Sequence, residues 1–166
     1  LFPYTTLFRS PLAEAEVVFK LAKDLDRSIS LEEVFDFVSH IAPGIEVFDC
    51  RYGAIDPYID DAIADNACAG AIAIGTWVEA KSHDLTASEI SIFVNESLNQ
   101  KVSTKAIAGN PWQAVVNASE KLANAGVVLP AGSIIFSGSA TNGIAMQPGK
   151  YRVEITGVGE VSFEAK

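Results

Sequence analysis

Two glutamates near the start of the chain have the type and spacing that could do chemistry. Glu14 and Glu16 lie in the stretch Leu12–Phe19 and alternate there with small and branched apolar residues. In a strand, both carboxylates would project from one face, roughly 7 Å apart. Like charges that close raise each other's pKa unless a cation lies between them, and hard oxygen donors suit Mg²⁺ or Mn²⁺. The pair indicates either a divalent metal site or a solvated edge strand that carries Glu twice, and by itself it favours the edge strand.

A third carboxylate lies in another strand-like stretch, Ile45–Cys50. Ile45 and Val47 share one face of this stretch, and Glu46 lies on the other. The stretch otherwise has the composition of a buried strand, and Glu is rarely buried without a partner. A nearby metal ion would supply that partner, and a position on a surface edge strand would equally explain Glu46.

The composition describes one acidic globular domain. The 166 residues are 49% hydrophobic and 20% charged, and their net charge of −9 argues against nucleic acid as a partner. No apolar run reaches the roughly 18 to 20 residues that span a bilayer, and no signal-peptide pattern opens the chain. We therefore expect a cytoplasmic protein without membrane contact. Cys50 and Cys68 lack the number and spacing of a disulfide framework or a zinc knuckle, so free thiols are expected.

Periodicity and turn signals predict the elements that must position these residues. Strands are expected over 12–22, 45–50, 70–75, 90–94, 102–107, 133–137, 151–156 and 160–165. Helices are expected over 31–40, 56–66 and 111–125. Strands dominate without a regular alternation of strand and helix, which predicts a β-rich α+β fold. Residues 1–11 are predicted to be a non-native or disordered leader, and residues 12–166 one domain.

A set of short motifs occurs in order along residues 12–166. They are Glu14-Ala15-Glu16, Leu25, Glu46, Arg51, Ala64–Ala67, Gly109–Pro111, Leu122–Gly126, Ser137-Gly138, Pro148-Gly149 and Gly157–Gly159. The set resembles the 2-keto-4-pentenoate hydratase and 4-oxalocrotonate decarboxylase branch of the fumarylacetoacetate hydrolase superfamily. The resemblance implies a mixed, twisted β-roll or sandwich with outer helices. It also implies that Glu14, Glu16 and Glu46 hold Mg²⁺ or Mn²⁺, which reverses the preference for a solvated strand.

The resemblance further implies a lyase. A 2-keto acid would chelate the cation, which would stabilise an enolate. We expect a 2-keto-4-pentenoate (2-hydroxypenta-2,4-dienoate) hydratase of meta-cleavage aromatic catabolism. The alternatives are a 4-oxalocrotonate decarboxylase or a non-catalytic supporting subunit. The resemblance also implies a homo-oligomer, or a complex with a related subunit or an aldolase. Family members extend further at the N-terminus, where the resemblance places a Lys and an Asp for proton transfer, so residues 12–166 are expected to bind metal but to turn over poorly.

The remaining site residues follow from the same resemblance. Asn66 stands near the position where the superfamily's hydrolases carry Lys, which disfavours hydrolysis, and Cys68 stands where the hydratase branch usually has Ser. Both are predicted as catalytic positions, although Cys68 could equally be a small buried residue. Gly138, Ser139 and Thr141 are predicted to border the substrate, or else to form a turn. Arg51 is expected to pair with Asp49, Asp60 or Asp61 rather than with a substrate carboxylate.

Overall fold

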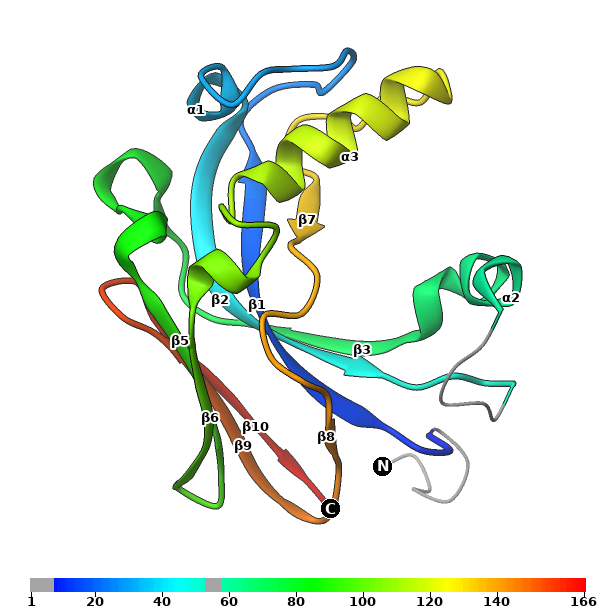
Figure 1. Ribbon diagram of the computed structural model, residues 1–166, viewed down its shortest axis with the longest axis vertical. Coiled ribbons are helices and arrows are strands. Elements are labelled where there is room, and N and C mark those ends of the chain that lie inside the picture. The colour runs from blue at the N-terminus through cyan, green and yellow to red at the C-terminus, as the bar shows by residue number, and fades with distance from the viewer. Residues whose placement is uncertain (1–7, 53–57) are drawn as a thin grey trace.

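The computed structural model describes residues 8–52 and 58–166, which form two antiparallel sheets packed against each other (Figure 1). The first sheet has the order β3-β2-β1-β7, and two short strands extend it, β4 beside β2 and β8 beside β1. Its strands are β1 (Leu12–Leu21), β2 (Val38–Phe48), β3 (Ala69–Ile74), β4 (Val78–Glu79), β7 (Ile134–Phe136) and β8 (Ile144–Ala145). The second sheet has the order β10-β9-β5-β6. Its strands are β5 (Glu89–Val94), β6 (Ser97–Ser103), β9 (Gly149–Ile155) and β10 (Gly159–Ala165). The strand-rich α+β prediction is confirmed.

The core lies where alternating apolar faces of the two sheets meet. Ala13, Ala15 and Val17 of β1 have no exposed surface, as the alternation in the sequence predicts. Ile90 and Ile92 of β5 are equally buried and belong to the same core cluster. Because β1 lies between β2 on one side and β7 with β8 on the other, it is a central strand. The solvated edge strand that the two glutamates favour by themselves is therefore wrong.

Helix α3 (Gln113–Asn124) crosses the upper ends of β1 and β7 (Figure 1), and the prediction of a helix over 111–125 is confirmed. Trp112, at its N-terminus, packs against Phe19 at 5.3 Å and Phe35 at 4.7 Å between ring centroids. Gly126 ends the helix with φ +67°, which lets the Val127 N–H reach the Leu122 carbonyl at 2.9 Å. None of the helices in the described ranges has the length and apolarity needed to cross a bilayer.

The helix predicted over 31–40 is wrong. Only one turn, α1 (Val34–Phe37), forms, and β2 begins at Val38 and runs through Pro43 and Gly44. The Ser30 and Glu33 pair, which is typical of a helix start, forms only a turn, in which Glu33 accepts a hydrogen bond from the Ser30 N–H at 2.9 Å. Pairing with β1 along ten residues then outweighs this local signal. Pro43 lacks an N–H but still contributes to the ladder, because its carbonyl accepts from the Gly75 N–H at 2.9 Å.

The loop between β5 and β6 is shorter than the gap between the predicted strands 90–94 and 102–107. Only Asn95 and Glu96 form the turn, with φ +49° and +63°, and β6 occupies most of the polar stretch expected as loop. Residues 104–106, expected as strand, form a 3₁₀ turn. Because β6 is an edge strand, its polar side chains stay in water without cost, so polarity gave no reason against a strand. The other predicted strands are found as β1, β3, β7, β9 and β10.

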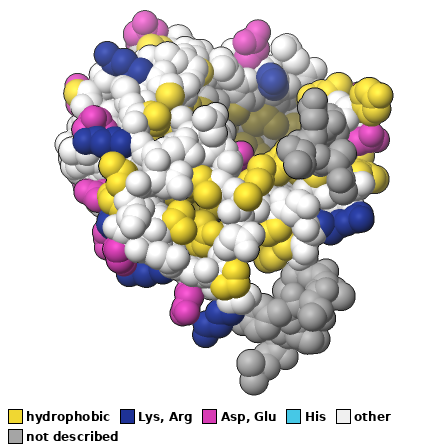
Figure 2. Space-filling model, turned by 60° about the horizontal axis from the view of Figure 1, so that its bottom comes forward, with side chains coloured by type: hydrophobic (Ala, Val, Ile, Leu, Met, Phe, Trp, Pro, Cys, Tyr) yellow, Lys and Arg dark blue, Asp and Glu magenta, His cyan; other side chains and the backbone are white. Residues whose placement is uncertain are grey.

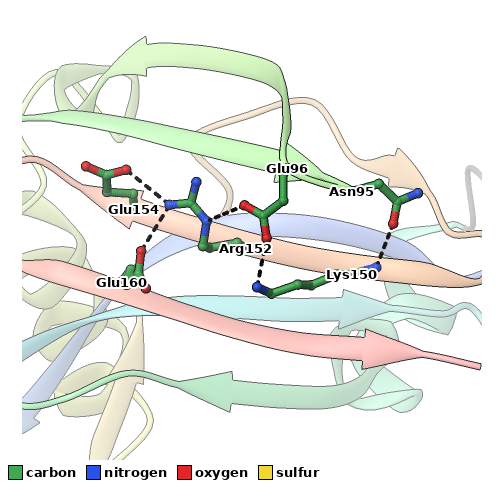
Figure 3. Close-up of polar contacts among 6 residues, drawn as sticks. All are labelled: Asn95, Glu96, Lys150, Arg152, Glu154 and Glu160. Carbon is green, nitrogen blue, oxygen red and sulfur yellow. Dashed lines mark hydrogen bonds and ion pairs between the residues drawn. The ribbon is translucent and has the colours of Figure 1, made fainter.

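Figure 3 shows how this turn is held to β9 and β10. Lys150 donates its N–H to Asn95 at 2.9 Å and its ammonium to Glu96 at 2.8 Å. Arg152 lies between Glu96, Glu154 and Glu160, with its guanidinium 4.0 Å from the ring centroid of Phe93. Because most of these charged side chains are about half exposed, each ion pair contributes only modestly to the stability of the second sheet.

The remaining predicted segments lie partly outside the described residues. Helix α2 (Ile59–Ala64) falls within the predicted 56–66, of which residues 56 and 57 are outside. Residues 1–7 of the predicted leader are also outside. Within the rest of that leader, Asp49 accepts hydrogen bonds from the Arg9 and Ser10 N–H groups at 2.8 and 2.7 Å, and the Pro11 carbonyl accepts from Met146 at 2.9 Å. The start of the domain at residue 12 stays a prediction.

Candidate metal centre

The register between β1 and β2 brings the three predicted glutamates to one place. Glu14 pairs directly with Glu46 across the two strands, and Glu16, two residues along, pairs with Gly44. Paired residues and their next-but-one neighbours lie on the same face of a sheet. One carboxylate oxygen from each of Glu14, Glu16 and Glu46 lies within 4.8 Å of the other two. Oxygens at the octahedral distance of about 2.1 Å from a common Mg²⁺ fall within this separation.

Glu16 is the most constrained of the three. Its side chain has no exposed surface, and its Oε2 accepts a hydrogen bond from the Gly138 N–H at 2.8 Å. Its Oε1 is buried and finds no hydrogen-bond partner among the described residues. A buried polar atom without a partner costs free energy, so this oxygen requires a proton, a cation or a bound water.

The electrostatics of the metal-free cluster lead to the same requirement. Burial, together with the neighbouring Glu46 carboxyl group, raises the pKa of Glu16 to about 9. Burial and the charge of Glu46 raise the pKa of Glu14 to about 6. Without a cation Glu16 holds a proton at neutral pH, whereas a divalent cation would let it ionise beside the other two carboxylates. Three carboxylates, one of which has a buried oxygen without a partner among the described residues, therefore fit Mg²⁺ or Mn²⁺. Positions on the cation are left for ligand oxygens or water.

The loop after β7 completes the wall beside Glu16. It takes the place of a strand next to β1, with the Ser137 N–H donating to the Val17 carbonyl at 3.0 Å and the Ala140 N–H to the Ala15 carbonyl at 2.9 Å. Gly138 has φ +82°, a left-handed conformation that glycine adopts without strain, and there its N–H reaches Glu16. Gly138 is thus adjacent to the glutamate cluster, and its predicted place beside the substrate stays a prediction.

Ser139 and Thr141 have different surroundings. The Thr141 hydroxyl is buried and accepts from the Ala15 N–H at 3.4 Å, so it is directed at the backbone of β1. The Ser139 hydroxyl donates to the Thr141 carbonyl at 2.7 Å, and the residue also lines a cavity of about 390 Å³ beside α3. Of the two, Ser139 has the better access to a bound molecule.

That cavity contains residues that sequence reasoning missed. Asn117 and Lys121 line it from α3, opposite Phe136 and Ser139, and Lys121 is the one charged residue among the described residues of the lining. The two residues are four apart on one face of α3, next to Ala114 and Ala118. The spacing along a small-residue helix face was the available signal, but nothing local indicated that this face meets the loop after β7.

The two predicted catalytic positions lie elsewhere. Cys68 has no exposed surface, and its ligand atom groups with those of Cys50 and Asp65, not with the glutamates. Burial and the neighbouring Cys50 raise the pKa of Cys68 to about 11, so the group is a neutral thiol. Asn66 is exposed on the turn before β3, with φ +54°. Catalytic roles for both residues stay predictions. Arg51 forms an ion pair, but with Asp65 instead of the aspartates expected.

Figure 2 shows a face of the molecule on which hydrophobic side chains gather, with a hollow near the top of the view that has a hydrophobic floor and an acidic side chain at its edge. A separate cavity of about 460 Å³ is lined mainly by apolar residues such as Ile72, Met146 and Phe163. None of the three glutamates lines it. Its size alone therefore does not make it the chemical site.

Comparison with known proteins gives one consistent result. The sequence model of the family described as fumarylacetoacetate (FAA) hydrolase C-terminal matches residues 5–164. The chain is 32% identical to a 4-oxalocrotonate decarboxylase from a Pseudomonas species over 154 residues, which cover 92% of this chain and 60% of the relative. It is 31% identical to a 2-keto-4-pentenoate hydratase from Paraburkholderia xenovorans over 165 residues, covering 96% of this chain and 60% of the relative.

Solved structures agree on the fold. The 4-oxalocrotonate decarboxylase from Pseudomonas putida G7, complexed with magnesium and adipate, matches with a TM-score of 0.87 at 25% identity, covering 93% of this chain and 60% of that one. A maleylpyruvate hydrolase from Sphingobium matches with a TM-score of 0.72 at 21% identity, covering 94% of this chain and 55% of that one, which shows the fold alone. The chain thus spans about 60% of the length of the curated relatives it matches.

Proposed function

Because the chain belongs to the fumarylacetoacetate hydrolase C-terminal family, we propose that it forms the cation-binding part of a lyase acting on 2-hydroxy-2,4-dienoates, with the activity of a 2-keto-4-pentenoate hydratase. The observation that carries the proposal is the buried Oε1 of Glu16, which has no hydrogen-bond partner in residues 8–52 and 58–166 and lies beside Glu14 and Glu46. Magnesium, calcium and manganese each accompany a related solved structure, which supports a divalent metal cofactor, for which we propose Mg²⁺ or Mn²⁺.

In this proposal the three glutamates bind the cation and Gly138 orients one of them. Glu14, Glu16 and Glu46 would hold the cation through one oxygen each, and the Gly138 N–H fixes the orientation of Glu16. The cation, when bound, supplies Lewis-acid stabilisation for negative charge on a 2-oxo acid. Glu16 is fully buried and so is not hydrated by bulk water, which strengthens its attraction for a cation, whereas Glu14 and Glu46 are half-buried and leave the centre accessible.

A second activity, 4-oxalocrotonate decarboxylation, is favoured by one observation. Lys121, an exposed residue of α3, lines the cavity that Gly138 and Ser139 also line. An ammonium suits a remote carboxylate, which a decarboxylase substrate carries and the dienoate of the hydratase lacks. The decarboxylase relative that was solved with adipate, a dicarboxylate, supports this alternative.

Partners and activity of the complete protein are also proposals. We propose a small 2-oxo or 2-hydroxydienoate acid as ligand, and a homo-oligomer or a complex with a related subunit or aldolase as the assembly. A supporting, non-catalytic subunit would retain the metal centre without turnover. Metal binding and turnover must for this reason be measured separately.

The test compares the chain with its Glu16→Ala and Glu120→Ala variants. Mn²⁺ binding is measured by isothermal titration calorimetry, and loss of a 2-hydroxydienoate by its ultraviolet absorbance, with CO₂ analysis to separate the two reactions. Glu16→Ala should weaken Mn²⁺ binding by more than about tenfold, because loss of even an outer partner of a metal ligand costs about 10 to 100-fold. Glu120 is exposed on α3 and serves as the matched control. Equal Mn²⁺ affinity in all three proteins would discard the metal centre.

A further inference from the structure

A second group of metal-ligating side chains lies outside the glutamate cluster. Cys50 follows β2, and Asp65 and Cys68 precede β3, so the group closes the segment that connects these two strands. The exposed fractions of the three side chains are 4%, 7% and 0%. One ligand atom from each, two sulfurs and a carboxylate oxygen, lies within 4.8 Å of the other two.

Asp65 is held in a fixed orientation toward the two thiols. The Arg51 backbone N–H donates to Asp65 Oδ2 at 3.1 Å, its Nε donates to Oδ1, and its Nη2 donates to the Asp65 carbonyl at 2.8 Å. Each carboxylate oxygen keeps a lone pair beyond the one that Arg51 uses. This arrangement matches an outer partner that orients a metal-ligating carboxylate.

The connecting segment has few other anchors among its described residues. None of the six residues of α2 is buried, and Ile59 and Ile63 are 73% and 69% exposed. Beyond α2, the three consecutive residues Asn66, Ala67 and Cys68 have φ values of +54°, +54° and +60°. Non-glycine residues in this region are strained, and they persist only where the surroundings determine them. With the backbone in this conformation, the Cys68 sulfur lies beside the ligand atoms of Cys50 and Asp65.

We propose that Cys50, Asp65 and Cys68 bind a borderline-soft divalent cation of the zinc class, distinct from the hard-cation centre at the glutamates. Two sulfurs and one oxygen supply three of the four positions of a tetrahedral site, and the fourth takes water or an external ligand. Binding replaces the two thiol protons, which leave to solvent. The cation's two charges are then matched by two thiolates and the Asp65 carboxylate by Arg51, so no buried charge stays uncompensated. The bound ion would tie both ends of the α2 segment to the first sheet.

Cobalt(II) is the probe, because sulfur ligation gives it an intense charge-transfer absorption in the near ultraviolet that carboxylate ligation does not give. The reduced chain, titrated with Co²⁺ after its glutamate centre is filled with Mg²⁺, should develop this band with one equivalent and lose it when Zn²⁺ is added. Cys50→Ser and Cys68→Ser should each abolish or strongly weaken the band. Glu16→Gln should leave it unchanged, which separates this site from the proposed function. Circular dichroism checks that each variant is folded.

Arg51→Gln provides a second measurement that does not depend on losing a ligand. It should weaken Co²⁺ binding by about 10 to 100-fold while the band keeps its shape, since both sulfurs remain. The proposal is overturned if the wild-type chain shows no sulfur-to-cobalt band, or if the band survives in both serine variants. Formation of a Cys50–Cys68 disulfide in air without any metal uptake by the reduced chain, measured by mass spectrometry, would also overturn it.

Discussion

Glu16 lowers the stability of the metal-free chain at the position where it would bind a cation. Its carboxyl group is fully buried, with one oxygen bonded to Gly138 and the other without a partner among the described residues. An aliphatic side chain of similar size at this position would avoid that cost, because replacing buried polar groups by apolar ones is often neutral or stabilising. The cost is offset when a proton, a cation or a bound water reaches Oε1.

The pH dependence of stability follows from this residue. The pKa of Glu16 rises from its ordinary 4.5 to about 9 because of burial, so between these values the folded chain binds a proton that the unfolded chain does not. Stability from this group is fully present below pH 4.5 and is lost as the pH rises toward 9. The metal-free chain should therefore become less stable to urea from about pH 5 to about pH 8, with chelator present.

Two comparisons check this prediction. Glu16→Gln cannot ionise, so most of the decline in unfolding free energy should disappear, leaving the smaller part from Glu14, whose pKa is raised to about 6. Mn²⁺ should stabilise the wild-type chain more at the higher pH, because proton and cation compete for the same oxygens. A wild-type stability that rises over this range would contradict the buried state of Glu16.

At the scale of the elements, β2 positions the centre through Gly44. This residue lies opposite Glu16, and a Cβ added to it would lie 2.3 Å from Val18 Cγ2 and 3.1 Å from Phe136. Only glycine lets β2 approach β1 this closely on the face that carries Glu16 and Val18. The same close approach keeps Glu46 in register with Glu14.

Gly44→Ala should therefore destabilise the chain by about 1 to 3 kcal/mol, the usual cost of overpacking a core. It should also weaken Mn²⁺ binding, because β1 must shift at the position of Glu16. The free energy of unfolding is measured by urea denaturation with the slope checked for two-state behaviour.

Val18→Ala supplies the control for this prediction. It removes the atom that the new Cβ would meet, so the double variant should be more stable than the sum of the two single changes predicts. Strictly additive effects would show that the close approach of β2 to β1 is not the cause.

At the scale of the whole molecule, the cavity beside the metal centre joins α3 to the loop after β7. Lys121 faces this cavity from α3, and Gly138, which lines the same cavity, contacts Glu16 on β1. Helix, loop and strand thus meet at one place although they are distant in sequence. A ligand that reaches the cation centre could extend toward Lys121.

Lys121→Met tests whether the cavity selects a second carboxylate. With Mn²⁺ present, the variant should bind a dicarboxylate at least about tenfold more weakly, since a hydrogen bond to a charged group contributes about 1.5 to 3 kcal/mol. Its affinity for a monocarboxylate of equal chain length should not change. Both affinities are measured by calorimetry, which does not depend on turnover.

Lys101→Met is the matched control, because Lys101 lies on β6 and pairs with Glu89 at 2.7 Å away from the cavity. It should leave both affinities as they are. An equal loss for both ligands in Lys121→Met would instead indicate a general effect of charge, and no loss would remove the support for a decarboxylase.

The sequence by itself determined the features that depend on near neighbours. Alternation placed Glu14 and Glu16 on one face of β1, and the signals at Asn110, Pro111 and Gly126 bounded α3 within two residues. The carboxylates by themselves left a metal site and a solvated strand open, and the resemblance carried by the short motifs indicated a hard cation at Glu14, Glu16 and Glu46. Periods, caps and ligand preferences act over a few residues, so a single sequence carries them.

The tertiary structure alone decided the features that depend on pairing between distant segments. It made β1 a central strand, extended β2 through Pro43, and buried Glu16 against Gly138, 122 residues later in the chain. The Lys121 cavity and the Cys50 group arise in the same way. Burial and register are set by which segments pack together, and the free energy of that packing outweighs local propensity. A short sequence pattern records only the local propensity.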